Sequence, residues 1–367
     1  MTNSRVKTAP RKKESGELRK GFTTGACAAA AAKAAAYILI KEQNVNEVEI
    51  SLPAGQKAVF EIYDLNYEND VALATIIKDA GDDPDVTNGA EIGAEVRFYT
   101  KGFGITVKAG KGVGQVTKPG LAVPVGQPAI NPVPMKMIKD ELCKVLKETD
   151  CPLGLEATIF VPRGEELAKR TLNERLGIRG GISILGTTGV VEPISTKAWT
   201  DTVVAAMSVA KACGVSHVVL TPGRTSETAA MSIFEKLPQE AFIQMGDHVG
   251  FSLAEARKKG FVKVTVVGQF GKLVKIAMGN ARTHAKDATL ELGFLADLAQ
   301  QVGLSRRKVE TIRAANTARE VFLELRKNGS HEFFRRICEL VNLTARDFLG
   351  GKIEFECIMV DYEGKRI

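Results

Sequence analysis

The sequence predicts two domains, an α+β N-terminal domain and a Rossmann-like α/β C-terminal domain whose sheet is largely parallel. The chain has 367 residues, which corresponds to two domains of roughly 150 residues or a little more. The first half alternates apolar and polar residues between glycines and prolines, whereas the second half alternates apolar strands with helical stretches. We expect the domains at 18–163 and 164–367, after a disordered basic tail at 1–17.

Positive charge is concentrated at the N-terminus. The net charge is +7, and the first twenty positions hold seven basic but only two acidic residues. Because the remainder is nearly neutral and holds a single tryptophan, we expect no nucleic-acid surface. Six cysteines without CxxC spacing and four scattered histidines predict a cytoplasmic protein with free thiols and no bound metal. The oligomeric state stays open, and a homo-oligomer is compatible with the sequence.

The N-terminal domain begins with an alanine-rich helix that we expect from Thr24 to about Gln43. Lys33 interrupts this apolar run and no cleavage site follows it, so we expect neither a signal peptide nor a membrane span. Alternation and turn residues predict the elements that follow, which are strands at 47–52, 58–63, 71–77, 94–99, 105–107 and 121–125, a helix at 135–147 and a strand at 155–161.

In the C-terminal domain the sequence pattern predicts strands and helices in alternation, which favours a parallel, doubly wound sheet. A charged helical stretch at 165–175 precedes it. We expect strands at 182–185, 217–221, 242–245, 262–267 and 353–360, helices at 196–213, 226–236 and 250–259, and a mostly helical segment at 288–348.

A glycine-rich turn follows the first expected strand of the parallel sheet. Gly186, Thr187, Thr188 and Gly189 come directly after the apolar run that ends at Leu185. The spacing matches neither GxGxxG nor a phosphate loop, so a nucleoside without phosphates fits better than a dinucleotide. Open α/β sheets bind ligands at this edge, although an ordinary tight turn explains the same residues.

Two later strand ends are further candidates for the same ligand. Gly223 follows the strand expected at 217–221, and Asp247 follows the one at 242–245. Asp247 could bind a ribose, or it could cap the helix that begins near Gly250. A nicotinamide-binding fold would place an acidic residue near Gly223, and none is present.

Basic residues and threonines precede the alanine-rich helix. Arg19 and Lys20 stand just before Thr23, Thr24 and Gly25, and either threonine can cap the helix. Free N–H groups at a helix start attract anions, so these five residues form a candidate receptor for a carboxylate. Simple capping explains them equally well.

Four carboxylates lie within seven residues. They are Asp79, Asp82, Asp83 and Asp85, and the spacing does not match a calcium-binding loop. Crowded carboxylates can raise one pKa and create a general base. Aspartates also cap turns, and the sequence leaves both roles open.

Four long strings in this order resemble the CbiD family of cobalamin biosynthesis, and the resemblance covers about residues 18–361. The strings are LRKGFTTGACAAAAAKAA, KDAGDDPDVTNGAEI, RGEELAKRTLNERLGIRGGISILGTTGVVEP and GQFGKLVKIAMGNARTHAKDA. Phe22, Ala26 and Ala285 depart from the tyrosine, threonine and serine that are frequent in the family.

The resemblance implies a methyltransferase that moves a methyl group from S-adenosylmethionine to C1 of cobalt-precorrin-5B, a cobalt-corrinoid tetrapyrrole. It also implies an α+β domain beside a Rossmann-like one. Sulfonium methyl transfer needs positioning more than a covalent nucleophile. For proton removal we nominate Asp82, Asp83 and Asp85 with Asp79, and then His284, which is as well explained by a structural role. Two alternatives remain, a nicotinamide-dependent oxidoreductase and a non-catalytic carrier of corrin intermediates.

Overall fold

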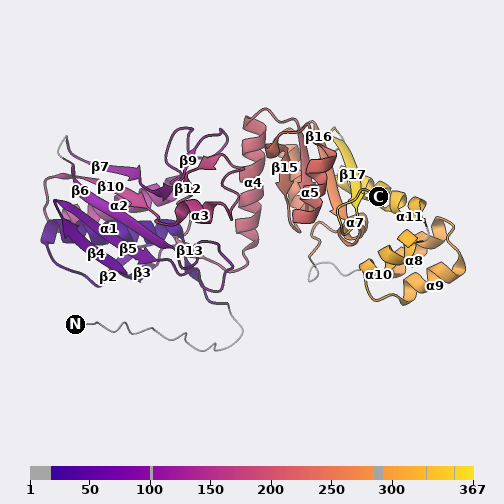
Figure 1. The fold of residues 1–367 in the computed structure, drawn as a ribbon, viewed down its shortest axis with the longest axis horizontal. Coiled ribbons are helices and arrows are strands. Elements are labelled where there is room, and N and C mark those ends of the chain that lie inside the picture. Colours follow the sequence, from indigo (N-terminus) through magenta and orange to yellow (C-terminus); the bar gives the residue numbers. More distant parts are fainter. Residues whose placement is uncertain (1–17, 100–101, 285–291, 328, 351) are drawn as a thin grey trace. The chain divides into compact units, whose positions relative to one another are not determined.

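A computed structural model describes residues 18–99, 102–284, 292–327, 329–350 and 352–367 (Figure 1). The expected tail at 1–17 and the family position Ala285 lie outside these residues. The chain divides into two compact units. Unit 1 contains Met1–Gln115, Gln127–Thr171 and Arg179–Ser195, and unit 2 contains Val116–Gly126, Leu172–Ile178 and Thr196–Ile367. The change of sequence pattern near residue 163 falls inside unit 1, because the chain returns to it after residue 178 and pairs with its strands.

Unit 1 is built on a five-stranded sheet. In order across the sheet, the strands are β4 (Asp64–Glu68), β5 (Val71–Ile77), β6 (Glu91–Tyr99), β10 (Gly154–Phe160) and β7 (Ile105–Ala109). All neighbours are antiparallel except β10 and β7. A separate hairpin joins β2 (Glu47–Ser51) to β3 (Lys57–Glu61). The strand expected at 121–125 is wrong: these residues form turns, because Pro124 has no N–H for a strand ladder.

Helix α1 (Thr24–Lys41) forms the core of unit 1. It packs against β5, β6 and α2 (Pro132–Glu148), and its alanines are buried because small side chains let these neighbours approach from several sides. Lys33 is buried with them, and its Nζ lies 3.0 Å from Glu141 and donates to the Glu49 carbonyl at 2.8 Å. The alanine-rich run is therefore a buried helix of a globular unit, as expected.

The segment expected to begin the parallel sheet belongs to unit 1, so that prediction is wrong. Strand β12 (Gly181–Ile182) pairs with β8 (Gly112–Val113), and β13 (Val190–Val191) pairs with β1 (Gly21–Phe22). Residues 181–184 of the apolar run are buried within unit 1 instead of in the parallel sheet, and Leu185 at its end is exposed. The remaining elements are α3 (Gly164–Ala168) and the two short strands where the chain passes between units, β9 (Gln115–Val116) and β11 (Ile178–Arg179).

Unit 2 contains a four-stranded sheet in which all neighbours are parallel, as the alternating pattern predicted. Across the sheet the strands are β15 (Phe242–Gln244), β14 (His217–Thr221), β16 (Lys263–Gln269) and β17 (Glu354–Val360). The helices are α4 (Thr196–Ala212), α5 (Arg224–Ile233), α6 (Val249–Lys258), α7 (Phe270–Ala277), α8 (Leu292–Gln301), α9 (Arg306–Ala314), α10 (Ala318–Lys327) and α11 (His331–Leu349), with a 3-10 turn η1 (Gln239–Ala241).

The order of the strands places a switch point between β14 and β16. The chain leaves β14 toward β15 on one side, then returns to β16 on the other side. Right-handed crossovers put α5 and α6 on opposite faces of the sheet, and α5 packs on β14, β15 and β16 while α6 packs with α4 and α11. In parallel sheets the crevice at such a point, beyond the carboxyl ends of the strands, is where ligands bind.

Candidate functional site

The glycine-rich turn at 186–189 lies in unit 1 and packs tightly there. Gly186 has a φ of 128°, and a Cβ at this position would lie 2.4 Å from the Thr23 side chain. The Gly189 carbonyl accepts a hydrogen bond from the Thr23 N–H at 3.0 Å. Thr187 and Thr188 are exposed, and the Thr188 hydroxyl is bonded to Val190 within the turn. The contacts match the tight-turn interpretation, and the strand tip we expected beside it is not there.

The start of α1 is covered by the same segment. Thr23 caps the helix by accepting from the Ala26 N–H at 3.2 Å, and the Gly25 N–H donates to the Leu185 carbonyl at 3.0 Å. The Thr24 hydroxyl accepts from the Leu185 N–H at 2.9 Å. A carboxylate receptor needs free N–H groups at this helix start, and those of Gly25 and Ala26 are already engaged.

Arg19 and Lys20 are exposed and ion-paired. The Arg19 guanidinium forks onto both carboxylate oxygens of Asp79, and this pairing holds the Asp79 pKa below its usual range. The Arg19 backbone N–H also donates to Asp82 Oδ2 at 2.9 Å. Lys20 Nζ lies 2.8 Å from Glu192. The structure therefore brings the first basic residues and the acidic cluster together in unit 1.

Asp83 and Asp85 organise the acidic loop. Asp83 Oδ1 accepts from the Ile194 N–H at 2.9 Å. Asp85 pairs with Lys78 at 2.7 Å, and the Lys78 side chain is only 1% exposed. Burial raises the pKa of Asp85, but the Lys78 ammonium and the Thr87 hydroxyl outweigh burial and lower it. The expectation of a raised pKa is therefore wrong for Asp79 and Asp85, because each faces a cation.

The carboxyl end of β14 has the features of an open ligand site in unit 2. Thr221, its last residue, is fully buried, and its hydroxyl oxygen has no hydrogen-bond partner among the described residues. Gly223 follows in extended conformation, and a Cβ there would meet no described atom within 4 Å. Helix α5 begins at Arg224, so its N-terminus faces this turn. The sequence singled out Gly223 but missed Thr221, because nothing local marks a hydroxyl as unpartnered.

Asp247 lies at the end of β15 in a polar cluster. Its Oδ1 accepts from the Thr283 hydroxyl at 2.7 Å and pairs with Lys272 of α7. Burial raises the Asp247 pKa, but Lys272 and Thr283 outweigh burial and lower it. His284 is exposed, and its charge contributes in the same direction. Asp247 forms no side-chain cap on α6, whose N-cap is His248, so the capping prediction is wrong.

Trp199 stands beside this cluster on the first turn of α4. It is the single tryptophan of the chain and is 45% exposed. A Cβ on Gly246 would lie 2.7 Å from the indole, so the ring rests directly on this glycine at the end of β15. An exposed aromatic face beside a strand end offers a stacking surface for a planar ligand.

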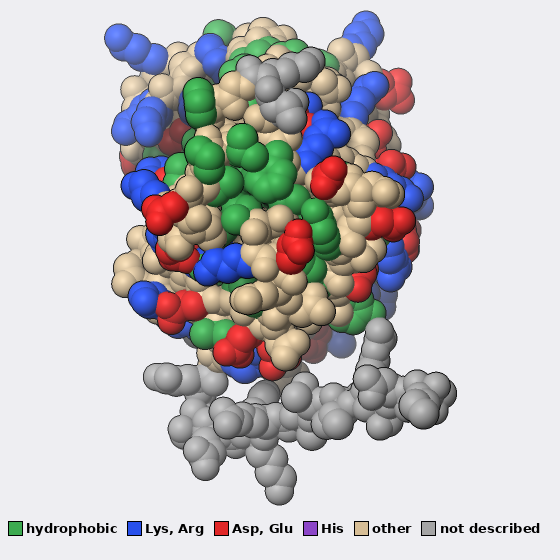
Figure 2. All heavy atoms as spheres, turned by 90° about the vertical axis from the view of Figure 1, so that its left-hand side faces the viewer, with side chains coloured by type: hydrophobic (Ala, Val, Ile, Leu, Met, Phe, Trp, Pro, Cys, Tyr) green, Lys and Arg blue, Asp and Glu red, His purple; other side chains and the backbone are tan. Residues whose placement is uncertain are grey.

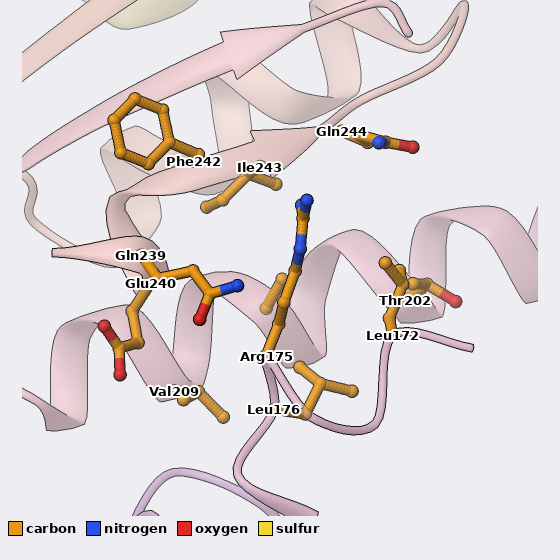
Figure 3. Close-up of a pocket in the computed structure, with 11 residues that line it drawn as sticks. Leu172, Arg175, Leu176, Thr202, Val209, Gln239, Glu240, Phe242, Ile243 and Gln244 are labelled. Carbon is orange, nitrogen blue, oxygen red and sulfur yellow. The ribbon is translucent and has the colours of Figure 1, made fainter. Parts of the chain in front are cut away.

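A small cavity of unit 2 is lined by residues of α4, η1, β15 and the segment 172–176 (Figure 3). Its volume is about 20 Å³, which is room for roughly one water molecule. Arg175 lines the cavity, and its guanidinium donates to both carboxylate oxygens of Glu227 of α5. Glu227 also accepts a hydrogen bond from the Gln244 side chain at 2.6 Å. These contacts anchor the segment 172–178 on the parallel sheet. A second cavity of about 370 Å³ is lined by α11 and β17, and the described residues lining either cavity include none of the predicted site residues.

The surface and helices of the described residues add three observations. On the unit 1 face that Figure 2 shows, Lys and Arg side chains are interspersed with Asp and Glu around a central hydrophobic patch.

Within the described ranges, no helix combines the length and apolar character needed to cross a bilayer. The described His, Cys, Asp and Glu side chains form no group of three or more that could hold a metal ion.

Comparison with known proteins gives family matches at both ends of the chain. The CbiD family model matches residues 11–193, and the model of the CbiD C-terminal domain matches residues 282–367. A cobalt-precorrin-5B C(1)-methyltransferase of Priestia megaterium is 48% identical over 96% of both chains. One of Geobacter metallireducens is 46% identical over 94% of this chain and 97% of its own. A crystal structure of the cobalamin biosynthesis protein CbiD from Archaeoglobus fulgidus is 34% identical, covers 73% of this chain and 82% of its own, and has a TM-score of 0.41, too low to support a comparison of folds.

Proposed function

The chain belongs to the CbiD family, and on that premise we propose that it is a cobalt-precorrin-5B C(1)-methyltransferase of cobalamin biosynthesis. The observation that carries the proposal is the match to relatives of that name over nearly the whole of both chains, at 48% identity for the one from Priestia megaterium. Identity at this level over both units argues that the whole machinery is shared, not one module alone. The protein is then a methyltransferase whose acceptor is a corrinoid tetrapyrrole.

We propose S-adenosylmethionine as the methyl donor and the carboxyl edge of the unit 2 sheet, in a Rossmann-like arrangement, as its site. When bound, this molecule supplies a methyl group that its sulfonium already activates. The parallel sheet has its switch point between β14 and β16, which is where open α/β sheets bind ligands. The site contains no Walker-type loop, which agrees with a nucleoside that carries no phosphate.

Three features of this edge support the donor. The buried Thr221 hydroxyl has no partner among the described residues, and a buried polar group without a partner is costly unless a ligand satisfies it. Gly223 leaves the space above the turn open. Asp247 is held by Lys272 and Thr283, which keeps its carboxylate ionised and fixed. We therefore move the proposed donor contacts from the 186–189 turn to Thr221, Gly223 and Asp247.

The acceptor carries many carboxylates, and exposed cations remain its proposed contacts. Arg19 and Lys20 pair with Asp79 and Glu192 at exposed positions. Surface ion pairs are weak, so carboxylates of a ligand compete for the same cations at little cost. For proton removal we retain Asp82 and Asp83, because Asp85 is committed to the buried Lys78. Thr23, Thr24 and Gly25 we assign to packing at the start of α1.

The test is turnover with purified protein. Cobalt-precorrin-5B and S-adenosylmethionine labelled in its methyl group are incubated with the full chain, and the product is analysed by mass spectrometry. The proposal predicts a product heavier by one labelled methyl group, formed only with donor and enzyme present. Binding of the tetrapyrrole without any mass increase would instead indicate a carrier, and reduction of the substrate by a nicotinamide would indicate an oxidoreductase.

A further inference from the structure

Two cysteines of unit 2 lie side by side in an open cavity. Cys338 is on α11 and Cys357 is on β17, and α11 packs on β17 (Figure 1). The two thiols lie close enough for each to shift the pKa of the other. Both line the cavity of about 370 Å³, a volume in the range of small-molecule sites. Neither the proposed methyl transfer nor the fold requires a pair of thiols here.

The surroundings give the two thiols different chemistry. The neighbouring Cys357 thiol lowers the pKa of Cys338, and the Met359 N–H and the Arg366 charge lower it further, whereas burial and the Glu339 charge oppose them. Burial and the neighbouring Cys338 raise the pKa of Cys357. Because the thiolate is the reactive form of cysteine, Cys338 is suited to attack and Cys357 to follow as the second thiol.

The charges that line the cavity favour an anionic partner. Arg335 and Arg366 both line it, but Arg335 is already paired with Glu332 and Glu339, so Arg366 is the cation that a ligand would meet. Arginines bind carboxylates well because their planar donors match carboxylate geometry. A small acidic peptide therefore fits the cavity better than a neutral or cationic one.

We propose that Cys338 and Cys357 form a thiol–disulfide exchange site for a small acidic peptide disulfide of the glutathione type. The Cys338 thiolate attacks one sulfur of the external disulfide, whose S–S bond breaks and releases one peptide thiolate. Cys357 then loses its proton to that thiolate and attacks Cys338 Sγ, which releases the second peptide as a thiolate that takes a proton from water. The protein dithiol is oxidised by two electrons, and the external disulfide is reduced to two thiols.

The other cysteines supply internal controls. Cys143 and Cys213 are exposed, so a non-selective oxidant reaches them as easily as the pair. Cys27 is buried, and burial raises its pKa to about 12, so its thiol stays protonated. The product expected at Cys338 and Cys357 is a disulfide within the chain, whereas Cys143 or Cys213 would carry a mixed disulfide with the peptide.

The experiment treats the reduced full-length protein with glutathione disulfide, blocks the remaining thiols by alkylation and maps the products by peptide mass spectrometry. The proposal predicts a Cys338–Cys357 disulfide, formed at least tenfold faster than any adduct at Cys213. Cys357→Ser should stop the reaction at a glutathione adduct on Cys338, and Cys338→Ser should leave Cys357 unmodified. Cys213→Ser is the matched control and should react like the natural chain.

Thermal unfolding provides a second measurement on the same samples. The oxidised protein should unfold at a higher temperature, because the new bond restrains the unfolded chain between α11 and β17. The proposal is overturned if both cysteines of the natural chain are still alkylated after treatment, or if they carry separate adducts and no bond between them. Since the natural chain decides this result, a variant that fails to fold does not obscure it.

Discussion

Glycine turns in the two units have opposite surroundings. In unit 1 a Cβ on Gly186 would lie 2.4 Å from the Thr23 side chain, so this glycine allows two segments to pack closely. In unit 2 a Cβ on Gly223 would meet no described atom within 4 Å, so this glycine leaves space open at the end of β14. Both glycines follow apolar runs in the sequence. A glycine after a strand is therefore a candidate for a ligand site only where the space beside it is empty, and that condition favours Gly223 over Gly186.

The largest expected effect tests whether the acidic loop of unit 1 is structural. Asp85→Asn removes the carboxylate that pairs with the buried Lys78, and an unpaired buried charge costs about 3 kcal/mol of unfolding free energy. Urea unfolding at neutral pH measures this loss of unfolding free energy. Asp70→Asn, at an exposed position, is the control, and its unfolding free energy should change little. A normal free energy of unfolding together with lost turnover would instead make Asp85 a catalytic group and weaken the contrast between the units.

The same pair predicts a pH dependence. The folded pKa of Asp85 is lowered, so its stabilisation is fully present above the unfolded value of about 3.9 and is lost as pH falls through the lower folded pKa. Acid titration followed by circular dichroism should show a steeper loss of stability in the natural chain than in Asp85→Asn. Parallel curves for the two proteins would contradict the assignment.

The glycine pair gives a direct test of the comparison. Gly186→Ala places a Cβ against Thr23 at a φ of 128°, which should cost about 2 kcal/mol of unfolding free energy. Gly223→Ala should change stability by less than about 0.5 kcal/mol while weakening binding of S-adenosylhomocysteine. Chemical denaturation of both variants measures the unfolding free energy, and calorimetry measures binding of S-adenosylhomocysteine. If Gly223→Ala binds normally and a stable Gly186 variant does not, the donor site belongs in unit 1.

Thr221→Val tests whether the Thr221 hydroxyl belongs to the donor site proposed at the carboxyl edge of the unit 2 sheet. Replacing an unpartnered buried hydroxyl with a methyl group should raise unfolding free energy by about 1 kcal/mol. The same change should weaken S-adenosylhomocysteine binding about tenfold, or about 1.4 kcal/mol, and Thr221→Ser should retain binding. A variant more stable than the natural chain with unchanged affinity would remove Thr221 from the site.

The smallest effect concerns the exposed cations of unit 1. Arg19→Ala removes a surface ion pair with Asp79, so unfolding free energy should change by less than about 1 kcal/mol. If Arg19 contacts an acidic group of the acceptor, KM should rise about threefold with kcat retained. Steady-state kinetics at two salt concentrations measures this, and an unchanged KM would restrict Arg19 to its pairing with Asp79.

Local sequence patterns predicted many of the helices and strands. They did not predict which distant segments pair with one another. The buried alanine helix and the parallel strands of unit 2 follow from periodicity and turn residues, and both are confirmed. The run ending at Leu185 has the same local pattern as those strands, but it pairs with β8 in unit 1. The acidic cluster was open to two roles because the sequence does not reveal that Lys78 is buried opposite Asp85.

The candidate site shows the same limit. Family membership was predictable from four long strings, and the family models confirm it. Gly223 and Asp247 were predictable as strand-end residues, whereas Thr221 and Trp199 were not, because their significance lies in an unpartnered oxygen and an exposed ring.

The most direct test is a crystal structure of the protein with S-adenosylhomocysteine. The account predicts the nucleoside at the carboxyl edge of the unit 2 sheet, with a polar atom hydrogen-bonded to the Thr221 hydroxyl and the ligand occupying the space beside Gly223. Density for the nucleoside against Gly186–Gly189 of unit 1, with Thr221 still unpartnered, would contradict it.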